Sequence, residues 1–225
     1  MLVKKIMLVV IVISVLFISP RPNVAFLVIC DGVKEISAFE YSRNDSLISV
    51  TIPDSAWLID RFAFAFNDSL TSVTIGNGVT VIGAYAFANC RSLTSVTMGN
   101  SVTTIEDSAF GGAKSLTSVT LPDSVTTISR MAFAGCRSLT SITIPDNVTT
   151  IGRSAFANCT SLVTVIISDS AVSAERAAFS GLRSLTEINI SGNVITIDDN
   201  AFRGCTSLSE ESRQRILEIN PNAVF

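Results

Sequence analysis

One stretch near the middle of the chain decides the fold: Ser138–Thr160, S-L-T-S-I-T-I-P-D-N-V-T-T-I-G-R-S-A-F-A-N-C-T. Nearly the same segment returns when the sequence is read forward or backward from it in steps of 23 residues. Each unit opens on a leucine, at Leu47, Leu70, Leu93, Leu116, Leu139, Leu162, Leu185 and Leu208. A phenylalanine stands 17 residues after each of the first seven, at Phe64, Phe87, Phe110, Phe133, Phe156, Phe179 and Phe202. A period of about 20–50 residues without a slipped register predicts a solenoid.

The order of residues within this unit predicts the course of one coil. Thr140–Ile144 mostly alternates polar and apolar residues, which is the pattern of a half-buried strand. The Pro-Asp-Asn that follows predicts a turn, and Val148–Ile151 a second extended piece. Ser154–Ala157 is expected to form one 3₁₀ or α turn that places Phe156 in the core. Because one coil cannot bury its own apolar face, its stability must come from the coils above and below.

The repeat also resembles a known family. The pattern L-T-S-V-T-I-P-D-S-V-T-x-I-G-x-x-A-F-x-x-C is similar to the BspA-type leucine-rich repeat, and the similarity covers most of the chain. It implies an α/β repeat solenoid: a right-handed leucine-rich-repeat superhelix of 23-residue coils with short parallel strands and short 3₁₀ or helical turns. It also implies export to the cell surface and adhesion to host or neighbouring-cell proteins.

Residues 1–22 are predicted to be a signal peptide or a signal anchor. Lys4 and Lys5 precede an apolar run over residues 6–18, the layout of a secretory signal. The run is shorter than the roughly 20 residues of a spanning helix. No A-x-A cleavage pattern follows, so an uncleaved anchor remains an alternative, in which only residues 6–18 would contact a membrane. A buried strand or helix is the third interpretation.

The rest of the chain divides into two caps and a repeat array. Residues 23–46 are predicted to be a degenerate N-terminal capping repeat, because the apolar columns continue there and Tyr41 falls in the phenylalanine column. Residues 47–207 hold seven 23-residue leucine-rich repeats, and residues 208–225 are predicted to be a C-terminal capping helix. Ser207 and Glu210 are expected to form its capping box.

Four cysteines share one column of the repeat: Cys90, Cys136, Cys159 and Cys205. Other coils place Asn67, Ala113 or Leu182 there, so the column is predicted to point inward and its thiols to be reduced core residues. A disulfide between Cys136 and Cys159 is the alternative. It is disfavoured because side chains on adjacent coils should run parallel and not face each other.

Composition excludes several classes of function. The chain has no histidine, which removes the commonest general base and the commonest metal ligand. No C-x-x-C, Gly-rich phosphate loop or G-x-S-x-G elbow occurs. We therefore expect no enzyme activity, no catalytic residue, no cofactor and no metal site. The net charge of −3 argues against a nucleic-acid partner.

The candidate binding surface is a ladder of hydroxyls on the predicted strand face: Ser72, Thr74, Ser95, Thr97, Ser118, Thr120, Ser141 and Thr143. Such a ladder suits recognition of a protein edge, a glycan or ordered water, but solubility and β-propensity are the favoured explanation, and ice binding is a distant third option. The sixth full coil adds Val163 and Ile166, apolar residues in this polar field that can mark a contact site, although drift in a tolerant repeat is the favoured explanation. The same coil carries Ala171 and Ala174 at core positions, which predicts a weak seam.

Two charged columns flank this surface. Arg91, Lys114, Arg137 and Arg183 form a basic column, and Asp54, Asp123, Asp146 and Asp169 form an acidic one. Each is expected to be a solvated edge that can steer a charged partner.

Together these features predict a non-enzymatic, secreted or cell-surface protein that mediates protein–protein interaction or adhesion. Its expected partners are extracellular-matrix or cell-surface proteins, and the chain itself is expected to be a monomer. The alternative is a structural surface-layer or spacer protein without a specific ligand.

Overall fold

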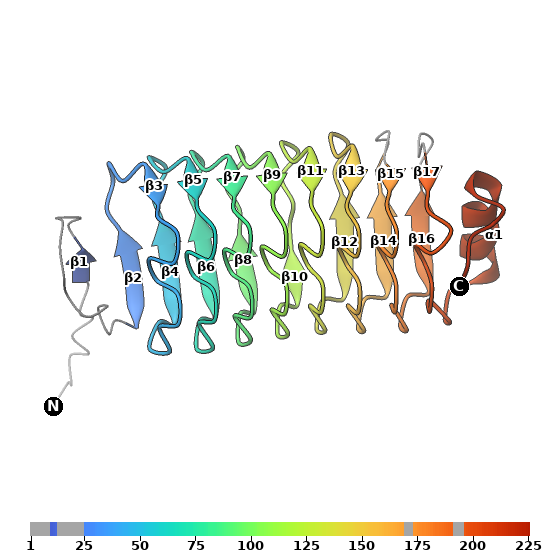
Figure 1. Cartoon of the computed structure of the whole chain (residues 1–225), viewed down its shortest axis with the longest axis horizontal. Coiled ribbons are helices and arrows are strands. Elements are labelled where there is room, and N and C mark those ends of the chain that lie inside the picture. The colour runs from blue at the N-terminus through green and yellow to red at the C-terminus, as the bar shows by residue number, and fades with distance from the viewer. Residues whose placement is uncertain (1–9, 13–24, 169–172, 191–195) are drawn as a thin grey trace, which may run out of the picture.

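The computed structural model describes residues 10–12, 25–168, 173–190 and 196–225. The chain winds into a long solenoid whose coils stack side by side, with the strand β1 (Val10–Val12) at one end and a helix at the other (Figure 1). This is the predicted architecture of parallel strands in 23-residue coils with little helix.

Each coil contributes a strand, of three or four residues in every coil but that of β10, to one side of the solenoid. These strands are β2 (Phe26–Ile29), β4 (Ser49–Ile52), β6 (Ser72–Ile75), β8 (Ser95–Thr97), β10 (Ser118–Val119), β12 (Ser141–Ile144), β14 (Thr164–Ile167) and β16 (Glu187–Ile190). They form two parallel sheets, β1-β2-β4-β6-β8-β10 and β12-β14-β16, so regular pairing stops between β10 and β12. We call the outward side of these two sheets the strand face.

A second side carries one eight-stranded parallel sheet of shorter strands. Its members are β3 (Glu35–Ile36), β5 (Leu58–Ile59), β7 (Val81–Ile82), β9 (Thr104–Ile105), β11 (Thr127–Ile128), β13 (Thr150–Ile151), β15 (Ser173–Ala174) and β17 (Thr196–Ile197). The turn between the two sides falls at the predicted Pro-Asp-Asn, so the order of elements within a coil is as the sequence predicts.

The third side, which we call the turn side, is a run of β-turns and not the expected single 3₁₀ or α turn. Ala155 and Ala157 donate backbone hydrogen bonds within their own coil, to the carbonyls three residues earlier, whereas the Phe156 N–H donates to the Ala178 carbonyl of the next coil at 2.8 Å. The N–H groups thus alternate between the same coil and the next one. A helix would need all of them within one coil, which explains why the side stays a series of turns.

Two positions of the turn run have left-handed backbone in every coil but the last, which has one. Asn158 (φ 61°) belongs to the second such column, which in four other coils holds glycine at positive φ: Gly112, Gly135, Gly181 and Gly204. Glycine adopts this conformation without the steric penalty that a side chain brings. Ser154 (φ 58°) belongs to the first column, which has no glycine among the residues with positive φ.

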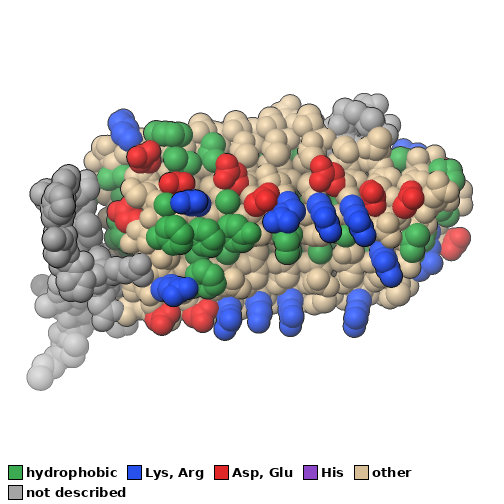
Figure 2. Space-filling view, viewed as in Figure 1, with side chains coloured by type: hydrophobic (Ala, Val, Ile, Leu, Met, Phe, Trp, Pro, Cys, Tyr) green, Lys and Arg blue, Asp and Glu red, His purple; other side chains and the backbone are tan. Residues whose placement is uncertain are grey.

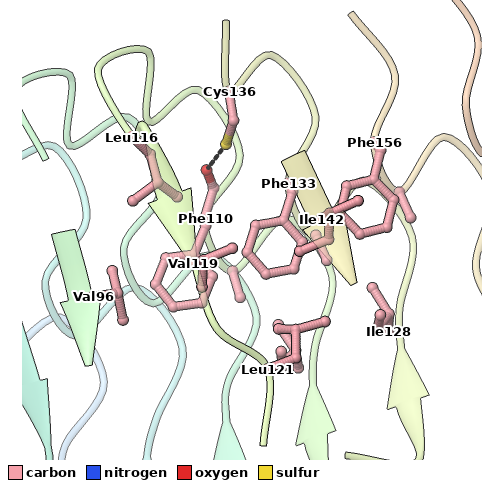
Figure 3. Packing of buried hydrophobic residues seen from close by; sticks show 14 of the residues in the cluster. Val96, Phe110, Leu116, Val119, Leu121, Ile128, Phe133, Cys136, Ile142 and Phe156 are labelled. Atoms are coloured by element: carbon pink, nitrogen blue, oxygen red, sulfur yellow. Dashed lines mark hydrogen bonds between the residues drawn. The ribbon is translucent and has the colours of Figure 1, made fainter. Parts of the chain in front are cut away.

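The phenylalanine column forms the predicted buried spine. Rings of successive coils stack nearly parallel, with centroids 5.3 Å apart for both Phe110–Phe133 and Phe133–Phe156 (Figure 3). Tyr41 continues the stack onto Phe64 at 5.2 Å, as its place in the column predicts. All seven phenylalanines are at most 1% exposed, so the hydrophobic core is a continuous line along the axis.

The four column cysteines are buried, unpaired thiols, as predicted. The structure adds a role that the sequence did not indicate. Each thiol donates to a phenylalanine carbonyl of the preceding coil, as Cys136 does to Phe110 at 3.3 Å (Figure 3). Asn67 makes the equivalent bond, from its side-chain amide to the Tyr41 carbonyl at 2.9 Å. The column therefore selects small donors as well as apolar residues.

The C-terminal helix α1 (Glu210–Ile219) packs on the last coil and buries Ile216. The predicted capping box is wrong by two positions. Ser209 is the N-cap, and its hydroxyl accepts a hydrogen bond from the Ser212 N–H at 3.2 Å. Ser207 instead donates to the Arg183 carbonyl of the preceding coil, because its side chain lies in the coil and not at the helix start.

At the N-terminal end, β1 (Val10–Val12) pairs in parallel with β2. It lies within the segment predicted to be an export signal; the remainder of that segment is outside the described residues. Among the described residues, no helix combines the length and apolar character needed to cross a membrane.

Candidate binding surface

The predicted hydroxyl ladder lies on the strand face. Parallel register places Ser72 beside Ser95 and Thr74 beside Thr97, and the next pairing places Ser95 beside Ser118. Beyond the break in the sheet, Ser141 pairs with Thr164 and Thr143 with Ile166. The strands alternate, so that the residues between these positions enter the core, and a two-wide row of side chains follows the axis.

The hydroxyls of this ladder differ in their hydrogen bonding from those of the threonines that stand just before the strand in most coils, which we call the opening threonines. Thr94 opens its strand and donates to the Thr71 carbonyl of the previous coil at 2.9 Å, and Thr71 in turn donates to the Ile48 carbonyl. By contrast, in the part of the chain that the structure describes, no intramolecular hydrogen bond engages the hydroxyls of the eight predicted ladder residues. Those hydroxyls are thus available to water or to a partner. Hydroxyl position, and not residue type, separates the two groups.

The apolar residues of the sixth full coil reach solvent. Val163 is 42% exposed and Ile166 38% exposed. Val163 occupies the position of an opening threonine. Its backbone N–H donates to the Thr140 carbonyl, but it has no hydroxyl to add the second bond that a threonine makes there. Ala174 is buried at its core position, while Ala171 lies outside the described residues. Whether this coil is a weak seam therefore remains a prediction.

A hollow of about 800 Å³ lies between α1 and the strand face of β14 and β16. Ile166 lines it together with Asn189, and Glu187, Glu211 and Glu218 bring carboxylates to it. Glu218 forms an ion pair with Arg215, whose guanidinium is 3.0 Å away. The exposed isoleucine thus lies at the edge of a recess and not on a flat surface.

A second hollow of about 800 Å³ follows the break between β10 and β12. Four ladder residues line it: Ser118, Thr120, Ser141 and Thr143. Asp123 and Asp146 line it at the turn end of the strands. The gap in the sheet therefore coincides with a recess of hydroxyls and carboxylates.

The basic column lies at the start of the strands, on the corner next to the turn side. Lys114, Arg137 and Arg183 are exposed and, within the described ranges, have no ion-pair partner, whereas Arg91 pairs with Asp68 at 3.7 Å. A row of Lys and Arg side chains follows one edge of the molecule in Figure 2.

The acidic column lies at the opposite end of the strands. Asp54 uses its carboxylate to accept from the Asn77 N–H at 2.6 Å. Asp123 and Asp146 are exposed, and no side-chain bond to either carboxylate occurs within the described ranges. Asp169 is outside the described residues. Opposite charges therefore border the two ends of the same strands.

The sequence interpretation missed an aromatic column on the turn side. Phe39, Phe62 and Tyr85 stack with ring centroids 4.9 and 4.7 Å apart, at left-handed backbone positions. Phe39 is 47% exposed, and Phe66 nearby lies 5.4 Å from the Arg43 guanidinium. Reading every 23rd residue from Phe39 reveals the column. It is easily overlooked because the deeper phenylalanine column lies only two residues further on.

The acidic and thiol side chains of the described residues are the groups to consider for metal binding or nucleophilic chemistry. Within those residues, no group of three or more His, Cys, Asp or Glu is placed to hold a metal ion. Burial raises the pKa of the Cys90 thiol to about 12 and that of Cys205 to about 11. The hydrogen bond with Cys159, together with burial, raises the pKa of Cys136. Thiols with raised pKa values are poor nucleophiles at neutral pH.

Comparison with known proteins identifies the class to which this architecture belongs. The sequence profile of the BspA type leucine rich repeat region matches the chain in 6 copies, over residues 17–140 and 126–225. The chain belongs to the BspA-type leucine-rich repeat family.

A solved structure supports the fold. The crystal structure of the T. pallidum leucine-rich repeat protein is similar with a TM-score of 0.66 and 21% identity, over 90% of this chain and 88% of that one. A leucine rich cell surface protein from Faecalibacterium prausnitzii A2-165 is 26% identical, with a TM-score of 0.49. A leucine-rich repeat protein from Bacteroides ovatus ATCC 8483 is 28% identical, with a TM-score of 0.42. Both of these matches cover 82% of this chain and 65% of the other protein. No curated protein sequence matches the chain.

Proposed function

We propose that this protein is a non-enzymatic adhesion module, secreted or held at the cell surface, that binds extracellular-matrix or cell-surface proteins through its strand face. The observation that carries the proposal is the contrast between the two hydroxyl sets. The opening threonines are committed to bonds between coils, whereas the ladder hydroxyls are free and regularly spaced. Membership of a family that includes surface proteins supports the proposed location.

The binding site within the strand face is centred on Ile166. It is exposed, it interrupts a polar row, and it lies beside the hollow under α1. A partner that buries this side chain gains hydrophobic contact, while the neighbouring hydroxyls supply hydrogen bonds for orientation. Carboxylates around the hollow favour a partner segment that carries Lys or Arg.

The test is binding of the full chain to a panel of immobilised extracellular-matrix proteins and detergent-extracted cell-surface proteins. Ile166→Glu is compared with Met131→Glu. Both replace apolar residues of similar exposure, 38% and 40%, but Met131 lies on the turn side. We expect saturable binding to at least one panel member, weakened about tenfold or more by Ile166→Glu, the loss of one interface anchor. Met131→Glu should leave it unchanged.

Two outcomes contradict the proposal. Equal loss with both variants would mean that the strand face is not the site. Absence of any saturable partner would favour the alternative, a structural spacer that uses the same coils without a ligand.

A further inference from the structure

The two charged edges of the strand face match each other in spacing. Lys114 and Asp123 lie at the two ends of the β10 segment, and Arg137 and Asp146 at the two ends of the β12 segment. At β10 and β12 the charges of each column lie one coil apart, and neighbouring parallel strands are about 4.8 Å apart. Few extended peptides present charges at this interval, but a second solenoid of the same pitch does.

We propose that copies of this chain associate side by side, with the basic edge of one molecule against the acidic edge of the next. With coils aligned, Lys114 meets Asp123 of the neighbour and Arg137 meets its Asp146. All four side chains are exposed, and no ion pair within the described residues already engages them. The neighbour's cations enter the hollow between β10 and β12, where the two carboxylates lie beside hydroxyls.

The geometry of this contact is heterologous. The basic edge of one copy binds the acidic edge of the next. A row of any length therefore keeps one free edge of each sign at its two ends and can continue to grow. Each exposed ion pair contributes little by itself and is screened by salt. Association at physiological salt is therefore weak, and it becomes substantial in low salt or where many copies are held close together. This inference goes beyond adhesion and replaces the expectation of a monomer.

Other charges on the same columns are consistent with a contact centred on these two coils. Arg91 is already paired with Asp68, and Asp54 already caps a turn by accepting from Asn77. The equivalent positions of the acidic column in the next two coils are Asn77 and Asn100, which carry no charge. Within the described residues, the coils of β10 and β12 are thus the ones that carry an unpaired cation at one edge and an unpaired carboxylate at the other.

The experiment is sedimentation velocity on the full chain at about 0.01 M and about 1 M salt, where the Debye length is about 30 Å and about 3 Å. We expect sedimentation coefficients that rise with protein concentration in low salt and a monomer in high salt. Two variants reverse one edge each: Lys114→Glu with Arg137→Glu, and Asp123→Lys with Asp146→Lys. Each variant alone should be monomeric in both salts.

The decisive sample is an equimolar mixture of the two variants. At these two coils, one variant carries acidic side chains on both edges and the other carries basic side chains on both, so the mixture should assemble in low salt although neither component does. Circular dichroism of each variant verifies folding. A wild-type monomer in low salt, assembly that survives high salt, or a mixture that stays monomeric would each overturn the proposal. Ile166→Glu should leave assembly unchanged, which separates this result from that of the adhesion test.

Discussion

The inward and outward columns of the same coils follow different rules. Inside, the phenylalanine spine is nearly invariant: seven successive coils place the same ring in the same position. Outside, one column changes from Ser72 through Thr164 to Glu187 along the axis. Each inward ring must fit between two neighbours, so stacking enforces repetition. An outward side chain meets only solvent, so its column is free to vary and to carry a binding surface.

Removing a spine residue should produce the largest effect. Phe133→Ala deletes a ring that stacks on Phe110 and Phe156, and we expect the free energy of unfolding to fall by about 3–5 kcal/mol. Chemical denaturation measures it. Thr143→Ala on the strand face is the control and should change stability by less than about 0.5 kcal/mol. Similar small losses at both positions would mean that the rings do not form a cooperative core.

Titration of a buried thiol should produce an intermediate, pH-dependent effect. Cys90 has a pKa raised from 9.0 to about 12, so the folded state keeps the thiol protonated while the unfolded state ionises first. Its contribution to stability is complete below about pH 9 and is lost as the pH rises toward about 12, at about 1.4 kcal/mol per pH unit.

Denaturation of the wild type and of Cys90→Ala across this range tests the prediction. The stability difference between the two should shrink as the pH rises, because only the wild type carries the ionising thiol. A constant difference would show that the thiol titrates alike in the folded and unfolded states.

The two hydroxyl sets should give the smallest and most discriminating effect. Thr94→Val and Thr97→Val remove the same group from the same coil. Thr94 loses its bond to the Thr71 carbonyl, so its variant should be destabilised by about 0.5–1 kcal/mol. Thr97→Val should be neutral. Parallel thermal denaturation compares them; a reversed order would remove the structural distinction on which the proposed binding surface depends.

Much of the fold could be predicted because the repeat makes every inference eightfold redundant. The strand at Ser141–Ile144, the buried thiols and the tyrosine at the head of the spine all follow from column position. The turn side was less predictable. Whether its N–H groups bond within a coil or to the next one depends on the distance between coils, which no single unit encodes. The cap at Ser209 depended similarly on how the last coil meets the helix.

The candidate site divides in the same way. The sequence by itself determined which residues share a column, because a 23-residue period with alternating polarity places like positions in line. Only the tertiary structure decided what each column does. It commits the Thr94 hydroxyl to a carbonyl of another coil and leaves that of Thr97 free. It also opens a recess where pairing stops between β10 and β12. Contacts between coils join residues distant in the chain, so they exist only once the coils have stacked.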